Sequence, residues 1–231
     1  MKRDFETLVD IQPWRIEHLP SPAPDLVIAC ASVGHDATRA PSPEFVRTAT
    51  AGGRPGLFVI DVARSWATAP GFGEALRVAV DAMRARQEIA RILTIGSSMG
   101  GFAALRAAEE LPVDAVLAIS PQYRPAAPGE TRWRPWTDAL PTDLTAPLPE
   151  GPWIVLMHGI ADDAAQAMAF PERKGVDHLL FAGIAHSGLA AHLKAKGGPG
   201  GMIEAALAGD RRRLLRIASG AGGRRRAQLP R

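Results

Sequence analysis

The sequence has 231 residues, 46% of them hydrophobic and 22% charged, with a formal net charge of +3. This composition is ordinary for a globular domain with a sizeable core, and it excludes the disordered and collagen-like classes. No apolar run approaches the roughly 18 residues that a membrane span needs, so we expect no membrane partner. The single cysteine, Cys30, excludes an intramolecular disulfide. Together with a start that carries acids and lacks the apolar core of a signal peptide, it indicates a cytoplasmic protein.

Arginines are concentrated near the end of the sequence, in 211–216 and 224–226. Because no aromatic side chains alternate with them for base stacking, the pattern predicts a flexible basic tail over 218–231 and no nucleic-acid partner. No cluster of cysteine and histidine has the spacing of a zinc site, so we expect no metal and no cofactor. The oligomeric state stays open.

Short apolar runs alternate with helical segments after residue 25. The runs are nearly continuous in apolar residues, as in strands that are covered on both faces. The alternation predicts a single α/β domain over 1–231, with a mainly parallel, twisted sheet in a three-layer α/β/α arrangement. Residues 6–19 alternate more strongly and are expected as edge strands. The expected core strands are 25–32, 56–62, 91–96, 113–119, 153–158 and 177–182, and the expected helices are about 43–50, 73–88, 99–110, 164–170, 188–196 and 202–217.

The most informative turn lies between the expected strand 91–96 and helix 99–110, where Gly96, Ser98 and Gly100 stand in G-x-S-x-G spacing. A serine on a tight strand-to-helix turn has its hydroxyl pushed out of the backbone, and only small side chains fit two residues to either side. The helix N-terminus directs N–H groups toward the place where an oxyanion would form. The bare spacing also occurs by chance, but the flanking strand and helix make chance a much rarer explanation.

Two later loops carry an acid and a histidine. Asp162 and His186 follow the last two expected core strands, so both fall where parallel sheets place their sites. The chain order Ser98, Asp162, His186 is the order that a serine nucleophile on this kind of turn requires. Asp163 is the alternative acid. Of the other histidines, His158 is expected in a supporting position, His178 away from the site and His192 on the surface. His35 lies in the expected oxyanion loop, where a solvated position is the commoner outcome and contact with substrate is the alternative.

These three loops resemble those of the α/β-hydrolase superfamily, over roughly residues 25–195. The turn at Ser98 is the specific part of the resemblance, and the acid and histidine loops support it by position. More loosely, the stretches GSSMGGFAAL, ISPQ and Glu130-x-Arg132-Trp133 look like those of a group of small bacterial α/β-hydrolase-like proteins. The activities of that group are poorly defined, so the closer likeness implies no substrate.

The motif and the resemblance imply nucleophilic acyl transfer on a small acyl ester. Ser98 attacks the carbonyl, His186 takes the proton and later returns it, and Asp162 holds the imidazole in the required tautomer. Two alternatives to an ester hydrolase stay open. The same triad could transfer the acyl group to an acceptor other than water, or the scaffold could be a non-catalytic binding partner.

The oxyanion of such a reaction needs two hydrogen-bond donors. The first is expected to be the backbone N–H of Met99, directly after the serine. The second should come from the loop after the first core strand, 31–36, where the His-Gly signature usual for the superfamily is absent. We predict the Val33 N–H as this donor, with Ser32 as the alternative.

Segment 121–151 fits no core element. It holds seven prolines and leaves the sheet where the superfamily inserts caps over the active site. An irregular segment of this length inside a compact domain is usually functional or disordered. We predict a lid, with Trp133 or Trp136 facing the Ser98 pocket and binding substrate. Simple packing of the segment onto the body is the alternative.

Overall fold

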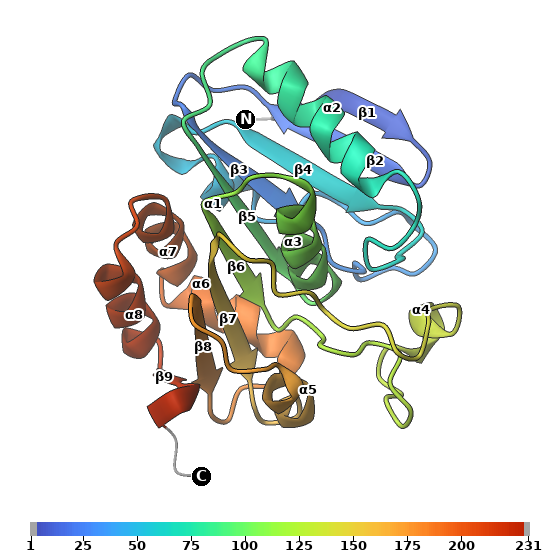
Figure 1. Ribbon diagram of the computed structural model, residues 1–231, viewed down its shortest axis with the longest axis vertical. Helices are drawn as coiled ribbons and strands as arrows, with labels where there is room; N and C mark the ends of the chain where they lie inside the picture. Colours follow the sequence, from blue (N-terminus) through green and yellow to red (C-terminus); the bar gives the residue numbers. More distant parts are fainter. Residues whose placement is uncertain (1–3, 229–231) are drawn as a thin grey trace.

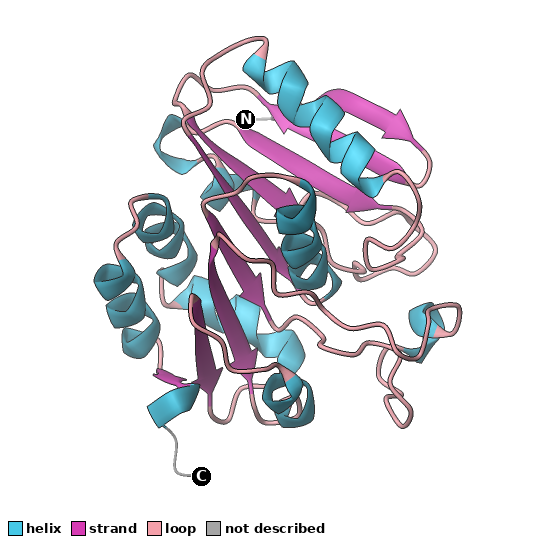
Figure 2. Ribbon diagram, viewed as in Figure 1, coloured by secondary structure: helices cyan, strands magenta, loops and turns pink. Residues whose placement is uncertain are grey.

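The computed structural model describes residues 4–228, which form a nine-stranded sheet with helices on both faces (Figures 1 and 2). The strand order is β1-β2-β4-β3-β5-β6-β7-β8-β9. The six strands from β4 to β8 in this order run parallel, and β1, β2 and β9 add antiparallel edges. The strands are β1 (Glu6–Ile11), β2 (Trp14–Leu19), β3 (Asp25–Cys30), β4 (Gly56–Asp61), β5 (Arg91–Ser97), β6 (Ala115–Ile119), β7 (Trp153–Gly159), β8 (Val176–Phe181) and β9 (Gly223–Arg225).

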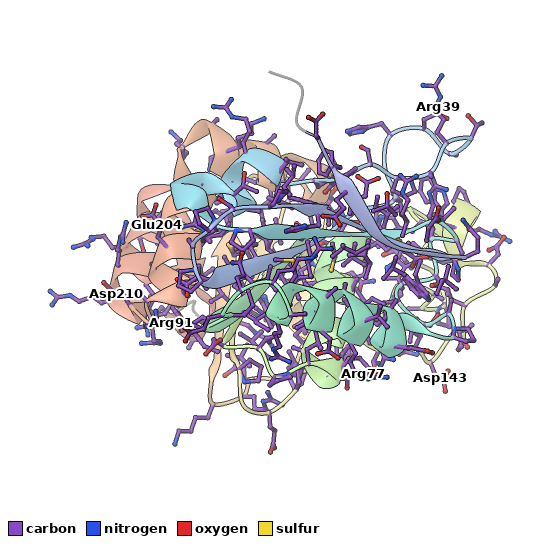
Figure 3. The ribbon with its side chains drawn as sticks, turned by 90° about the horizontal axis from the view of Figure 1, so that it is seen from above. Arg39, Arg77, Arg91, Asp143, Glu204 and Asp210 are labelled. Carbon is purple, nitrogen blue, oxygen red and sulfur yellow. The ribbon has the colours of Figure 1, made fainter. Side chains whose placement is uncertain are left out.

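Two apolar layers lie between the sheet and its helices. On one face, α2 (Phe72–Arg84) and α3 (Met99–Glu110) pack over side chains of β2, β3 and β6. The other face is covered by α1 (Val46–Ala49), α6 (Leu189–Ala195), α7 (Gly198–Leu207) and α8 (Arg211–Gly220). Seen from above, α1 and α2 lie on opposite sides of the sheet (Figure 3). The predicted three-layer α/β/α arrangement with a mainly parallel sheet is confirmed.

Two short helices lie outside these layers near the C-terminal ends of the parallel strands. α5 (Ala164–Ala169) follows β7, and α4 (Arg134–Thr137) is a single turn within segment 121–151 (Figure 1). Pro135 occupies the first turn of α4, where its missing N–H costs no hydrogen bond. The segment therefore contains one helical turn, although its seven prolines prevent a longer helix.

The expected helix 202–217 is two helices, α7 and α8, and α7 begins earlier than predicted. Gly209 adopts φ 66°, which ends α7, and the Asp210 side chain accepts a hydrogen bond from Arg213 N–H as the cap of α8. The glycine-rich stretch before residue 202 is helical because α7 and α8 pack closely there. A Cβ on Gly201 would stand 3.0 Å from the Ile217 side chain.

The basic end of the chain is ordered up to Gln228, in place of the flexible tail expected from residue 218. β9 pairs with Leu179–Phe181 of β8. The Arg226 guanidinium donates hydrogen bonds to the Ala167, Met168 and Phe170 carbonyls at the end of α5. These carbonyls have no partners within the helix, so the arginine satisfies them and ties the end of the chain to the body. Residues 229–231 of the expected tail lie outside the described residues.

Candidate active site

Ser98 stands at the apex of a strained turn between β5 and α3. Its backbone angles are φ 55° and ψ −123°, a region that non-glycine residues rarely adopt. A Cβ on Gly96 would overlap the Gly100 carbonyl, and a Cβ on Gly100 would overlap the Cys30 carbonyl of β3. Both glycines of the motif are therefore required by steric crowding, and the turn exposes the Ser98 hydroxyl beyond the ends of the strands.

The structure brings His186 and Asp163 to Ser98. His186 Nε2 lies 3.0 Å from Ser98 Oγ, and His186 Nδ1 lies 2.8 Å from Asp163 Oδ2. A carboxylate only accepts, so Nδ1 carries the proton and Nε2 is free to accept the serine proton. This is the arrangement in which a serine hydroxyl can be deprotonated by an imidazole.

The acid predicted first, Asp162, is corrected to its neighbour. Asp162 Oδ1 accepts the backbone N–H of His186 at 2.7 Å, and its side chain does not reach the imidazole. Asp163 is fully buried at the residue before α5, whereas Asp162 is exposed. The loops after β7 and β8 approach closely because Gly159 has no Cβ, which would overlap the Ile184 carbonyl. This close approach places the second of the two acids, Asp163, against Nδ1 of the imidazole.

The loop after β3, which holds the predicted oxyanion donor Val33, is fixed from behind by Arg64. The buried Arg64 guanidinium donates to the carbonyls of Val33, Asp36 and Arg39 at 2.8, 3.0 and 2.6 Å. Figure 3 shows Arg39 on the outer part of this loop, with its side chain pointing away from the body.

Ser32, the alternative donor, is occupied within the same loop. Its hydroxyl donates to Glu44 and accepts the Gly34 N–H at 3.3 Å. Its backbone N–H also hydrogen-bonds to Glu44. Burial raises the pKa of Glu44, although the hydrogen bonds from Ser32 oppose this shift. Ser32 Oγ is therefore turned toward Glu44, and Val33 N–H and Met99 N–H stay the predicted donors for an oxyanion.

Segment 121–151 reaches the imidazole through Trp133, which is 6% exposed. The Trp133 and His186 rings lie 4.8 Å apart between centroids, and the Arg132 guanidinium lies 4.0 Å from the centroid of the Trp133 ring. Arg132 also pairs with Asp163 at 3.1 Å and with Glu130 at 2.6 Å. The segment is thus attached to both the histidine and the acid of the site.

The second predicted tryptophan, Trp136, is half-buried and packs against the same core layer as Trp133. In the described part of the chain, no ring contact joins Trp136 to His186. Asp143 lies on the exposed side of the segment (Figure 3). The segment leaves the body near the C-terminal ends of the central strands and turns outward at α4 (Figure 1).

Gln122 contacts the serine and was missed by sequence reasoning. Its Nε2 donates to Ser98 Oγ at 2.7 Å, and its Oε1 accepts from Trp66 Nε1 at 3.1 Å. The available signal was the position of Gln122, directly after the expected strand 113–119 in the ISPQ stretch. An isolated glutamine after a strand carries no chemical pattern, so the contact becomes visible only in three dimensions.

Two buried histidines lie behind the site. His158 Nε2 donates to the Pro121 carbonyl at 2.9 Å, and His158 Nδ1 accepts from His178 Nε2 at 2.9 Å. Burial lowers the pKa of His158 to about 4. Burial and the neighbouring His158 lower the pKa of His178 to about 2. Both rings are neutral in the folded protein, and the pair supports the backbone that leads to Gln122.

This histidine pair predicts a loss of stability in mild acid. An unfolded histidine titrates near pH 6.5, so below that pH the unfolded chain binds protons that the folded chain does not. The free energy of unfolding should therefore fall between about pH 6.5 and 4, by a few kcal/mol. Urea unfolding of the wild type and of His178→Gln at several pH values measures this, and the variant should show the smaller slope.

The comparison with a variant is needed because buried acids act in the opposite sense. Burial raises the pKa values of Glu44 and Asp61, so each contributes stability that is lost as the pH rises. His35→Gln is the matched control, since His35 is exposed. An identical pH dependence in wild type and His178→Gln would contradict the prediction.

Among residues 4–228, no cluster of three or more histidine, cysteine, aspartate or glutamate side chains is placed to hold a metal ion. Across the same residues, the helices are too short or too polar to cross a bilayer.

Comparisons with known proteins give matches to solved structures. No family model and no curated protein matches the chain. A capsule O-acetyltransferase of Neisseria meningitidis serogroup A matches with TM-score 0.57 at 12% identity, over 80% of this chain and 90% of that one. An α/β serine hydrolase without a lid from Xanthomonas campestris gives 0.54 at 17% identity, over 90% and 94%. Est1E from Butyrivibrio proteoclasticus gives 0.51 at 13% identity, over 88% and 99%. The chain therefore has the α/β-hydrolase fold.

Proposed function

We propose that this protein is a serine hydrolase that cleaves a small acyl ester through an acyl-enzyme on Ser98. The observation that carries the proposal is the unbroken hydrogen-bonded path from Ser98 Oγ to His186 at 3.0 Å and on to Asp163 at 2.8 Å. A non-catalytic scaffold has no need to keep a strained serine, a buried acid and the intervening tautomer aligned. The fold shared with esterases and serine hydrolases is consistent with this chemistry.

The reaction follows from the positions of the three side chains. Ser98 Oγ bonds to the ester carbonyl carbon while its proton passes to His186 Nε2, and Asp163 stabilises the imidazolium that forms. The bond to the alcohol oxygen then breaks, and that oxygen takes the proton from Nε2. Water, deprotonated by the same nitrogen, attacks the acyl-enzyme, and Ser98 recovers its proton as the acid leaves.

Trp133 gives the proposed substrate site an apolar wall. Its indole packs against His186 and is held by the Arg132 guanidinium. A wall of this kind excludes water from the reacting carbonyl and accepts the hydrocarbon part of a short acyl or alcohol group. Trp136, near Trp133 in the chain, is the second proposed substrate contact.

A second candidate is transfer of the acyl group to an alcohol other than water, on the same three residues. Two observations favour keeping it: the similarity to an O-acetyltransferase and the covering of His186 by Trp133. Product analysis separates the two. A transferase forms a new ester when a sugar or other alcohol acceptor is added, at the expense of free acid.

The proposal is tested by labelling with a fluorophosphonate probe, which reacts only with an activated serine. The wild type should be labelled, and Ser98→Ala should not. Ser97→Ala is the matched control, because Ser97 precedes the nucleophile and, among the described residues, the hydrogen bond to His186 Nε2 comes from Ser98. Labelling that is unchanged in Ser98→Ala, or absent from the folded wild type, would overturn the proposal.

A further inference from the structure

Gln122 is a fully buried carboxamide that touches the reacting oxygen of the proposed site. Its side chain is 0% exposed, and its Nε2 lies 2.7 Å from Ser98 Oγ. Ser98 Oγ therefore has two partners: it donates to His186 and accepts from Gln122. Burying a polar amide is costly unless it is hydrogen-bonded. Here one of the partners of the amide is the nucleophile itself.

The direction of the Gln122 amide is fixed by Trp66. An indole N–H only donates, so it binds the amide oxygen, and the NH₂ group has to face Ser98. Trp66 is itself fully buried in the loop after β4. The hydrogen bond between the two side chains thus leaves one amide orientation, without any contribution from solvent.

The loop that carries Trp66 is built to hold it. Arg64, Trp66 and Ala67 have φ values of 53°, 53° and 55°, which are unfavourable for residues with a Cβ. The buried Asp61 carboxylate compensates by accepting the Ser65 N–H, the Ser65 hydroxyl and the Ala67 N–H. Strain of this kind persists only where the surroundings hold the backbone in place, and it is concentrated near functional sites.

A hydrogen-bond donor in this place has a use once the serine attacks. The Ser98 proton leaves to His186, and negative charge develops on the former carbonyl oxygen, which is bonded to the same carbon as Oγ. The Gln122 NH₂ group has two hydrogens, and only one is used by Oγ in the resting site. We propose that Gln122 is a further catalytic residue, whose side-chain amide donates a hydrogen bond to the developing oxyanion beside the backbone donors.

This inference rests on the proposed role of Ser98 and adds a donor from after β6. The loop after β3, which lacks the His-Gly signature, then supplies a smaller share of the oxyanion stabilisation. A preorganised donor in a water-excluded site stabilises the transition state more than the bound ester. The loss on removing Gln122 should therefore appear in kcat and leave KM nearly unchanged.

The decisive variant is Gln122→Leu, which keeps the size of the side chain and removes its donor. Hydrolysis of a p-nitrophenyl ester of a short acid should lose about 10²- to 10³-fold in kcat. Trp66→Phe keeps Gln122 but releases its orientation, and should lose about tenfold, the value of one hydrogen bond of ordinary strength. Gln87→Leu is the matched control, because the Gln87 amide donates to the Ala23 carbonyl outside the site. It should leave kcat unchanged.

A second measurement separates catalysis from simple support of the fold. A trifluoromethyl ketone that adds to Ser98 forms a tetrahedral oxyanion, so its affinity should fall by about 10²-fold in Gln122→Leu while KM stays near the wild-type value. If Gln122→Leu does not fold, the same pair of measurements on Trp66→Phe and on Gln122→Asn decides the question.

The outcomes for the two proposals differ. If the wild type is neither labelled nor active, the proposed function is wrong. A wild type that is labelled and active, with Gln122→Leu folded and within about threefold of its kcat and ketone affinity, overturns the role of Gln122 and leaves Ser98 in place. A gain of activity in Gln122→Leu would also overturn it.

Discussion

Ester hydrolysis by Ser98→Ala should fall by about five to six orders of magnitude relative to the wild type. The variant keeps His186 and the oxyanion donors but has no oxygen with which to form the acyl-enzyme, so only water attack remains. The backbone at this turn has φ 55° with either residue. The variant leaves the buried Gln122 amide without its Ser98 partner, so the melting temperature should fall by several degrees while the fold is kept. The kcat on a p-nitrophenyl ester and a thermal unfolding curve are the two measurements.

The control for this prediction is Ser97→Ala, which should retain turnover. Contaminating esterase activity from the expression host sets the floor, so the assay compares both variants after identical purification. Equal turnover by Ser98→Ala and wild type would remove Ser98 as the nucleophile.

Asp163→Asn should lower kcat by about 10⁴-fold, because an amide oxygen and NH₂ group in this position allow the wrong imidazole tautomer. The neighbouring Asp162→Asn should stay within about tenfold of the wild type, the value of one ordinary hydrogen bond. Its amide oxygen can still accept the His186 backbone N–H that Asp162 binds at 2.7 Å. The two variants differ by one position and by the atom of His186 that each contacts, so each is the control for the other.

Kinetics at saturating ester give the ratio of the two effects directly. Circular dichroism of both variants checks that the loops after β7 and β8 remain folded. A larger loss of kcat in Asp162→Asn than in Asp163→Asn would identify Asp162 as the acid that orients His186. The loop after β7 would then be placed differently in solution.

The layers of the fold could be predicted because each core strand has a recognisable local composition. A run such as 153–157 is apolar throughout, which is typical of a strand covered on both faces. The turn at Ser98 was predictable from its spacing between a strand and a helix. Gly96 is required by the nearby Gly100 carbonyl, whereas Gly100 is required by the distant Cys30 carbonyl of β3. The glycine-rich start of α7 was not predictable, because it is helical only where Gly201 meets Ile217 of α8.

The choice between Asp162 and Asp163 depended on a contact that the sequence does not contain. Both residues follow the same strand, and the selection is made by how far Gly159 lets the loop after β8 approach. The contact between Gln122 and Trp66 likewise could not be predicted from the sequence. They lie 56 positions apart, after different strands, and their meeting at Ser98 requires the order of the whole sheet.

The short β9 has a consequence for how the protein behaves in a crowded solution. It covers the backbone edge of β8 at Leu179–Phe181, an apolar stretch whose free N–H and C=O groups would otherwise be a template for strands of other molecules. The new edge is only three residues long and carries Arg224 and Arg225. Like charges on a short edge repel a second copy of the protein, so these arginines disfavour aggregation through this edge. A chain truncated before Gly223 would lose β9 and expose the backbone edge of β8 to other molecules.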